Sequence, residues 1–172
     1  MEFEAIARQY SGMQYRHIHR MVGNREDAQD ILQDVLLLIF RKLHTFRGDA
    51  SMKTWVFRIA SNRAIDFIRQ SRRRPTEALD EKLATKESPL AFTQRQAEID
   101  ALGHALDQLP AEQRQVVILK EIDGLTFREI SEITQIPENT AKTRMYTSLR
   151  KLRDILADNP DPETPDKQEM QK

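Results

Sequence analysis

The stretch "TFREISEITQIPENTAKTRMY", residues 126–146, predicts two short helices separated by a turn. Thr126 and Glu129 have the spacing of a capping box, which begins a helix by pairing its first free backbone N–H groups. Pro137 suits the first turn of a following helix, because proline has no backbone N–H to satisfy there. Residues 135–137 are therefore expected to form the turn of a helical hairpin.

The second helix of this hairpin has one apolar side and one polar side when it is wound at ~100° per residue. The apolar side, expected to pack on Phe127, Ile130 and Ile133, consists of Ala141, Met145, Leu149, Leu152 and Leu156. The side facing away consists of Asn139, Thr140, Thr143, Arg144, Thr147 and Arg150. Two helices with this turn and these side chains fit the major groove of DNA, whereas the alternative is a hairpin with a solvated face.

Composition restricts the classes of function. The 172 residues include no cysteine, which excludes disulfides and cysteine zinc sites. Net charge is zero, but residues 1–75 hold 14 Lys/Arg against 8 Asp/Glu, while residues 76–110 hold 3 against 7. Basic blocks on a neutral chain suggest surfaces that face a polyanion, or merely solvated faces. The acidic N-terminus does not resemble a secretory signal, so we expect a cytoplasmic protein.

Helical periodicity runs through most of the chain, and the sequence predicts an all-α protein of two small helical domains joined by a flexible acidic linker. Further helices are expected over 3–21, 25–43, 52–73, 90–109 and 110–122, with Gly23–Asn24 ending the first and capping the second, and Ser51 capping the third. The expected boundaries are a domain over 1–75, a linker over 76–98, a domain with the helix-turn-helix over 99–157, and a disordered tail over 158–172.

The predicted helix 52–73 and the loop before it interleave aromatic with basic side chains. Its aromatic residues are Phe46, Trp55, Phe57 and Phe67, and one side of the helix carries Thr54, Arg58, Asn62, Arg69 and Arg72. Aromatic rings and cations together suit unpaired bases, which stack on the rings while the backbone phosphates meet the cations. The alternative is that these aromatics are core residues. Asp66 is expected to form an ion pair with Arg63 or Arg69.

The predicted helix 25–43 carries Asp30, Gln33 and Asp34 on one face, beside the apolar run "ILQDVLLLIF". An acidic face repels DNA, so it is either solvated or docks onto a protein. The apolar run is too short to span a bilayer, so no direct membrane insertion is expected.

Catalytic chemistry finds little support in the sequence. No glycine-rich loop of the nucleotide-binding type is present, and His17 and His19 point to different faces of one helix. We therefore expect no enzymatic activity, no catalytic residues, no metal and no cofactor.

Taken together, these segments resemble the bacterial RNA polymerase sigma factors of the extracytoplasmic-function (ECF) group. In the N-terminal half the resemblance lies in "DAQDILQDVLLLIFRKLHTFRG" and "SMKTWVFRIASNRAIDFIR". In the C-terminal half it lies in "LDQLPAEQRQVVILKEIDGLTFREISEI" and "IPENTAKTRMYTSLRKLR". The resemblance covers residues 3–157, and it implies a region-2-like domain followed by a region-4-like domain.

The resemblance also implies partners and residue roles, with core RNA polymerase, promoter DNA and an anti-sigma protein as the expected partners. The resemblance assigns docking onto core polymerase to Asp30, Gln33 and Asp34. Contacts to the melted −10 element fall on Phe46, Lys53, Trp55, Arg58, Asn62 and Arg69. Contacts to the −35 duplex fall on Glu138, Asn139, Thr140, Lys142, Thr143, Arg144 and Thr147. The function implied is promoter-specific transcription initiation, in a stress or envelope response.

Two other classes of function stay open from the residues themselves. A free-standing helix-turn-helix regulator would use residues 1–75 for oligomerisation or sensing, and a nucleic-acid enzyme would need a metal or nucleophile constellation. The chain also departs from the G-T-V-K-S-R pattern common in the recognition helix of the ECF group, since residues 139–144 read N-T-A-K-T-R. Asn139 is the departure expected to alter base preference.

Overall fold

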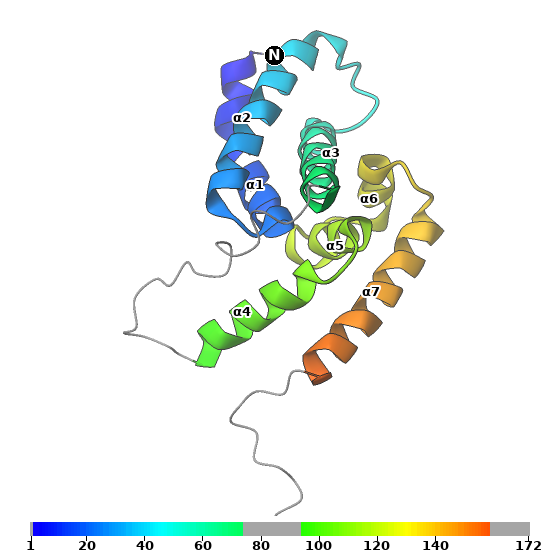
Figure 1. The fold of residues 1–172 in the computed structure, drawn as a ribbon. Coiled ribbons are helices and arrows are strands. Elements are labelled where there is room, and N and C mark those ends of the chain that lie inside the picture. The colour runs from blue at the N-terminus through cyan, green and yellow to red at the C-terminus, as the bar shows by residue number, and fades with distance from the viewer. Residues whose placement is uncertain (1, 74–93, 159–172) are drawn as a thin grey trace, which may run out of the picture.

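The computed structural model describes residues 2–73 and 94–158, and all regular structure in these ranges is helical (Figure 1). The elements are α1 (Phe3–Val22), α2 (Arg25–Lys42), the 3₁₀ turn η1 (Leu43–Thr45), α3 (Met52–Arg73), α4 (Gln94–Asp107), α5 (Ala111–Val117), the π turn η2 (Ile118–Ile122), α6 (Phe127–Thr134) and α7 (Glu138–Asp158). The all-α prediction is confirmed. Within the described ranges, no helix is both long and apolar enough to cross a bilayer.

Two residues set the break between α1 and α2. Gly23 adopts φ 74°, a left-handed conformation that glycine tolerates, and its N–H donates to the His19 carbonyl at 2.8 Å. The Asn24 side-chain oxygen then accepts from the N–H groups of Glu26 and Asp27 at 2.8 and 3.1 Å. The predicted end of the first helix and cap of the second are confirmed.

The helix-turn-helix hairpin forms as its local sequence predicts. Thr126 Oγ1 accepts from the Glu129 N–H at 3.2 Å, and a Glu129 carboxylate oxygen accepts from the Thr126 N–H at 2.8 Å. Gln135, at φ 59°, closes α6 through its N–H to the Ser131 carbonyl. The Ser131 hydroxyl donates to the Ile136 carbonyl at 2.6 Å, which fixes the turn. The capping box and the turn are both confirmed.

Helices α1, α2 and α3 form an N-terminal bundle around one apolar core. Its buried residues recur at helical spacing, and they are Ile6, Ile18, Ala28, Ile31, Val35, Ile39, Val56 and Ala60. Ser51 caps α3 as predicted, because its hydroxyl accepts the Thr54 N–H at 3.0 Å. Thr54 itself is buried rather than exposed on the basic side of α3.

Helices α4 to α7 form a C-terminal bundle in which α7 packs on α4, α5 and α6. Its core includes Leu106, Leu109, Val116, Leu119, Leu125, Ile130, Ile133, Ala141, Met145 and Leu152. The prediction that Leu149 and Leu156 belong to this core is wrong, since they are 38% and 40% exposed. At ~100° per residue both lie ~60–80° from the centre of the buried stripe, where Ser148 and Ile155 take their place.

The helix predicted over 110–122 forms, but its last turn is wider than an α-helical one. The Asp123 N–H donates to the Ile118 carbonyl, five residues back, at 2.9 Å. This turn ends with the Asp123 side chain directed at α1, where a carboxylate oxygen lies 2.6 Å from His17 Nδ1.

Helix α4 begins at Gln94, within the helix expected over 90–109 and inside the stretch 76–98 expected as linker, and the boundaries of the linker and of the two domains stay predictions. The rest of that stretch up to residue 93, and the predicted tail from residue 159, lie outside the described residues.

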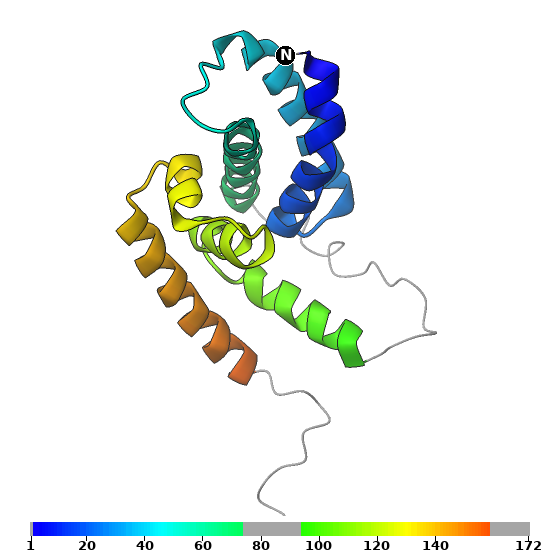
Figure 2. The same ribbon diagram turned by 180° about the vertical axis from the view of Figure 1, so that it is seen from behind.

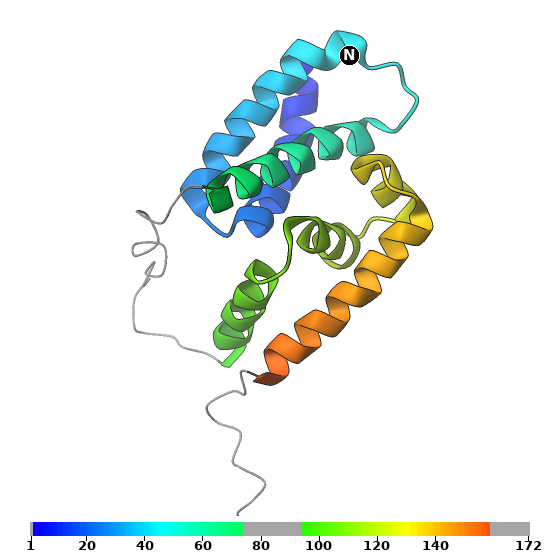
Figure 3. The same ribbon diagram turned by 45° about the vertical axis from the view of Figure 1, so that its right-hand side comes forward.

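The two bundles pack directly against each other (Figures 1 and 2). Helix α3 lies between α1 and α2 on one side and α5 and α6 on the other, as the turned view in Figure 3 shows. Phe57 of α3 is buried in the core of the C-terminal bundle. A third buried cluster joins Met21, Ala64, Ile65 and Ile68 of the N-terminal bundle to Ala111 and Ile118 of α5 and η2.

The capping box of α6 makes stability depend on pH. The hydrogen bond from the Thr126 backbone N–H holds the pKa of Glu129 below its ordinary value of 4.5. A lowered folded pKa means that the stabilisation is complete above pH 4.5 and is lost as pH falls through the folded pKa. Glu129→Gln keeps a capping side chain but cannot titrate.

We therefore expect the wild-type protein to be more stable than Glu129→Gln at pH 7, by ~0.3–1 kcal/mol as for other carboxylates at helix N-termini. The difference is expected to decrease as the pH falls below 4.5. Urea unfolding of both proteins between pH 7 and 3 measures it, and subtraction cancels the other carboxylates. A difference that persists unchanged at pH 3 contradicts this role for Glu129.

Candidate nucleic-acid and protein interfaces

The N-terminal half of α7 carries the residues predicted to read duplex DNA. Ala141 and Met145 are buried and anchor the helix on Ile130 and Ile133 of α6. The predicted contact residues around these anchors point outward: Glu138, Asn139, Thr140, Lys142 and Thr143 are exposed, and Arg144 and Thr147 are half-buried. All seven predicted residues therefore lie on or beside one solvent-facing surface of α7.

A shallow hollow lies on this surface of α7. It is lined by Gln113, Asn139, Thr140, Thr143, Arg144 and Thr147. Gln113 comes from the first turn of α5 and was not predicted as part of the site. The sequence carried no signal for it, because only the packing of α5 against α7 brings Gln113 beside the recognition residues.

Lys142 lies near the aromatic ring of Phe127 at the start of α6. Its ammonium nitrogen is 5.8 Å from the ring centroid, and the Lys120 ammonium is 5.0 Å from it. A cation over an aromatic face is attracted by the electron-rich face of the ring. Phe127 therefore gathers two cations close to the N-terminal end of the recognition helix.

The residues predicted to hold an unpaired strand are not one continuous surface. Phe46 and Trp55 are half-buried and lie together, with ring centroids 5.4 Å apart and planes tilted by 57°. Asn62 is exposed on the next turns of α3, and Arg58 beside it is half-buried. Lys53 and Arg69 lie further toward the C-terminal bundle, where Glu112 of α5 accepts hydrogen bonds from Arg69.

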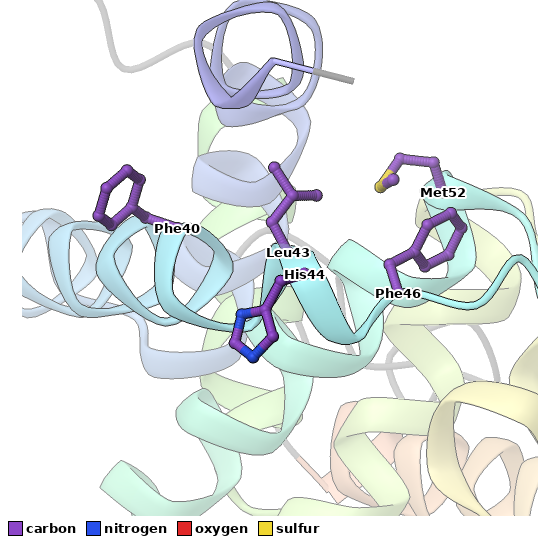
Figure 4. A pocket seen from close by; sticks show the side chains of 5 residues that line it. All are labelled: Phe40, Leu43, His44, Phe46 and Met52. Atoms are coloured by element: carbon purple, nitrogen blue, oxygen red, sulfur yellow. The ribbon is translucent and has the colours of Figure 1, made fainter.

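A hollow opens beside Phe46 at the end of α2 (Figure 4). Its walls are Phe40, Leu43, His44, Phe46 and Met52, whose side chains come from α2, η1, the loop after η1 and the start of α3. Of these five, only Phe46 was predicted as a site residue. The exposure of Phe40 could have been predicted from the sequence, because its position on the helix falls outside the buried stripe of Ile31, Val35 and Ile39.

One residue of the acidic face of α2, Asp34, forms an ion pair within the protein. Asp30 and Gln33 are exposed, whereas Asp34 accepts two hydrogen bonds from the guanidinium of Arg63 on α3, at 2.6 and 3.1 Å. The predicted pairing of Asp66 with Arg63 or Arg69 is wrong, because these cations bond instead to Asp34 and Glu112. Asp66 does contribute to the raised pKa of Arg69, after the larger effects of Glu112.

Two large apolar side chains continue the acidic face along α2. Leu37 is 54% exposed and Phe40 is 62% exposed. Exposed apolar residues beside charged ones are typical of a surface that docks onto another protein. Both lie in the run "ILQDVLLLIF", and neither was predicted as a docking residue.

Sequence profiles identify two known regions in the chain. Residues 6–74 match sigma-70 region 2, which spans the N-terminal bundle. Residues 99–152 match sigma-70 region 4, which spans most of the C-terminal bundle.

Several curated proteins are similar along most of the chain. The ECF RNA polymerase sigma factor SigW of Bacillus subtilis is 34% identical, over 91% of this chain and 89% of SigW. The ECF RNA polymerase sigma factor SigE of Mycolicibacterium smegmatis is 30% identical over 90% of this chain, which spans only 62% of the length of SigE. The ECF RNA polymerase sigma-E factor of Escherichia coli is 29% identical over 70% of this chain and 69% of its own.

Among solved structures, the sigma factor RpoE of Bartonella quintana, crystallised with the anti-sigma factor NepR, has a similar fold. Its TM-score is 0.69, with 92% of this chain and 98% of that chain covered at 21% identity. CnrH, solved with the cytosolic domain of CnrY, gives a TM-score of 0.68 over 92% of this chain and 89% of its own at 20% identity. At these identities the likeness concerns the fold alone.

Proposed function

The chain belongs to the ECF group of RNA polymerase sigma factors, and from that membership we propose how its surfaces divide the work of transcription initiation. Sigma factors direct core polymerase to promoters and are not enzymes. The match to region 2 over residues 6–74 decides against a free-standing helix-turn-helix regulator. The proposed domain boundaries are a region-2 domain over residues 1–75 and a region-4 domain that begins with α4.

The N-terminal half of α7 reads the −35 element as duplex DNA. This is supported by the seven outward residues around the buried anchors Ala141 and Met145, since a helix held this way can enter the major groove with its polar side. Asn139 and Arg144 can form paired hydrogen bonds with base edges, and Lys142 can meet phosphate. Gln113, in the same hollow, joins this set.

The −10 element is held as a melted strand along α3 and the loop before it. Phe46 and Trp55 offer ring faces for stacking, and the hollow in Figure 4 beside Phe46 offers an apolar place for a base turned out of the strand. Arg58, Asn62 and Arg69, together with Lys53, supply donors and positive charge along the strand. Met52, which lines this hollow with Phe46, contacts the base rather than the backbone.

Core polymerase docks on the outer face of α2. Asp30, Gln33 and Asp34 give this face its polarity, and the exposed Leu37 and Phe40 give it the apolar area that stable protein interfaces use. Asp34 meets the polymerase already oriented by Arg63, which lowers the entropy lost on docking.

An anti-sigma protein is proposed as a regulatory partner, which would place this chain in a stress or envelope response inside the cytoplasm. The support is the resemblance of the fold to sigma factors that were solved in complex with anti-sigma proteins. The sequence of the chain carries no further sign of the identity of that partner.

The observation that carries the function is the match of both regions along one chain, with an outward recognition helix in the second. Run-off transcription with purified core polymerase tests it, on a template that holds the DNA upstream of the gene for this chain. We expect a discrete transcript only when the chain is added. If no template from that region yields a defined start site, the assignment fails.

The role of α3 predicts a defect that is confined to melting. Arg58→Ala with Asn62→Ala is expected to lower open-complex formation at least about tenfold, because two hydrogen bonds to the strand, worth ~0.5–3 kcal/mol each, are removed. Polymerase binding is expected to change little. Permanganate reactivity of unpaired thymines and a polymerase pull-down measure the two steps.

The matched control for this double variant is Arg16→Ala with Gln9→Ala, which removes an exposed cation and an exposed amide from α1. Thymine reactivity equal to that of the wild type in the α3 variant, with normal folding by circular dichroism, is the outcome that contradicts the role of α3.

The role of α2 predicts a defect in docking instead. Asp30→Arg is expected to weaken core binding and to leave the Asp34–Arg63 pair intact. Adding Asp34→Arg is expected to weaken binding further, because a second charge is reversed in the interface. Fluorescence anisotropy with labelled chain and core polymerase measures the dissociation constant.

Glu121→Arg with Asp154→Arg makes the same change in net charge on exposed positions of the C-terminal bundle and serves as the control. Full retention of core by the doubly reversed α2 variant rules this face out as the docking site.

A further inference from the structure

The first turn of α5 presents the recognition helix with a hydrogen-bond acceptor that has no partner. Gln113 lines the hollow on α7, and its Oε1 is shielded from solvent without a hydrogen bond among the described residues. A shielded oxygen that stays unpaired is unfavourable, because it has given up water and gained no donor in return. Such an atom beside a binding surface is expected to acquire its donor when the surface is in use.

Helix α5 holds Gln113 on a fixed backbone. The Gln113 N–H donates to the Pro110 carbonyl at 2.9 Å. The neighbouring residues Ala111 and Arg114 are buried, and Arg114 donates to the Asp107 carbonyl at 2.7 Å. A side chain that orients another one needs a rigid support of this kind.

The donor for Gln113 is expected to come from the hollow itself. A base edge cannot reach Oε1 directly, because protein atoms cover this oxygen. The other side chains that line the hollow are Asn139, Thr140, Thr143, Arg144 and Thr147. The Thr143 hydroxyl already donates within α7, to the Asn139 carbonyl at 3.0 Å.

Arg144 is the best placed of the remaining donors. It lies between Thr140 and Thr147 on one stripe of α7, since positions three and four apart share a helix face. Its side chain has the longest reach of the three, and its guanidinium carries several N–H groups. In the part of the chain that the structure describes, this guanidinium forms no hydrogen bond or ion pair.

The charge of Arg144 is felt in the first turn of α5. The hydrogen bond from Arg69 is the largest cause of the lowered pKa of Glu112, and the positive charge of Arg144 adds to it. Arg144 therefore lies within electrostatic reach of the residue next to Gln113. Glu112 is already bonded to Arg69, which leaves Gln113 as the unpaired acceptor on this side of the hollow.

Base reading by arginine gains from such an acceptor. Arginine recognises guanine with two N–H groups, which bond to O6 and N7, and the guanidinium has further N–H groups to spare. The long side chain loses rotamer freedom when it is fixed on a base, and an acceptor in the protein reduces that loss. The same acceptor also fixes the direction in which the guanidinium points.

We propose that Gln113 is a positioning residue for Arg144 in the reading of the −35 element. When α7 enters the major groove, Gln113 Oε1 accepts one N–H of the guanidinium, and other N–H groups of Arg144 face the base edge. Gln113 acts through Arg144 and contacts no base itself. Base preference is then set by α5 together with α7. This proposal rests on the −35 role of α7 proposed above.

The test compares two substitutions of Gln113 in the full-length chain. Gln113→Leu removes the acceptor at similar volume, whereas Gln113→Glu keeps an oxygen at the same position. Holoenzyme assembled from core polymerase and the wild-type chain first selects from a library of randomised duplexes, and the enriched duplex becomes the probe. Each base pair of the probe is then replaced in turn. The ratio of the two dissociation constants gives the discrimination at that pair.

Arg144→Ala identifies the base pair that Arg144 reads. Gln113→Leu is expected to lower discrimination at this same pair about fivefold, as the loss of one hydrogen bond does, and to leave the other pairs unchanged. Gln113→Glu is expected to keep the discrimination or to raise it. In a chain that already carries Arg144→Ala, Gln113→Leu is expected to have no further effect. Gln108→Leu makes the same change at an exposed position just before α5 and is the matched control.

The guanidinium itself gives a second readout. Nuclear magnetic resonance of the full-length chain with the selected duplex follows the exchange of the Arg144 Nε–H proton with water. Slow exchange is expected in the wild type and in Gln113→Glu, and faster exchange is expected in Gln113→Leu. Circular dichroism and thermal unfolding verify that each variant is folded.

Three results overturn the proposal. An equal loss with and without Arg144 shows that Gln113 acts on DNA by itself. A loss at every base pair that Gln113→Glu does not restore shows a structural role only. Unchanged discrimination and exchange in Gln113→Leu show no role at all. Failure of the proposed function has a different signature, because the wild-type holoenzyme then enriches no duplex from the library.

Discussion

Helix α3 is buried on two sides, and the rest of the structure depends on this constraint. One side, with Val56 and Ala60, closes the core of the N-terminal bundle, and the other, with Phe57, Ala64 and Ile68, meets the C-terminal bundle. At ~100° per residue these two sides occupy more than half of the helix circumference. Only a narrow strip is left for polar contacts, and the strip carries Trp55, Arg58, Asn62 and Arg69.

Double burial explains why function and packing compete on this helix. A side chain such as Arg69 lies at the edge of the strip, where Glu112 can reach it from α5. Asn62, in the middle of the strip, is exposed. The contribution of each residue to strand binding is therefore set by its angle on the helix as much as by its chemistry. A helix buried on one side only would have left all of these donors free.

Polar contacts between the N-terminal and C-terminal bundles fix the relative orientation of the two bundles. Apolar contacts alone tolerate small rotations, whereas His17 and Arg114 keep their hydrogen bonds only in one relative orientation of the bundles.

Ion pairs within the protein lower the positive charge that is available to DNA. Arg63, Arg69 and Arg114 are each bound to a carboxylate within the protein, so counting basic residues along the chain overstates the cations that face a ligand.

Local sequence determined the helices, their caps and the residues on each helix face. Gly23 with Asn24, Ser51, and Thr126 with Glu129 act within one turn of the chain, and periodicity correctly assigned α3 and the anchors Ala141 and Met145. Leu149 and Leu156 were misassigned because two residues on the flank of a stripe are buried only if a neighbour covers that flank. Residues 126–146 alone were thus enough to identify the helix-turn-helix.

Only the tertiary structure decided which of these faces meet. Asp34 with Arg63, Arg69 with Glu112 and His17 with Asp123 join residues far apart in the chain, and no pattern in the sequence marks one acid rather than another as the partner. Gln113 entered the candidate site on α7 for the same reason. Helix formation follows from interactions between residues three or four positions apart, whereas pairing across bundles follows from the three-dimensional packing of the helices, which local spacing does not encode.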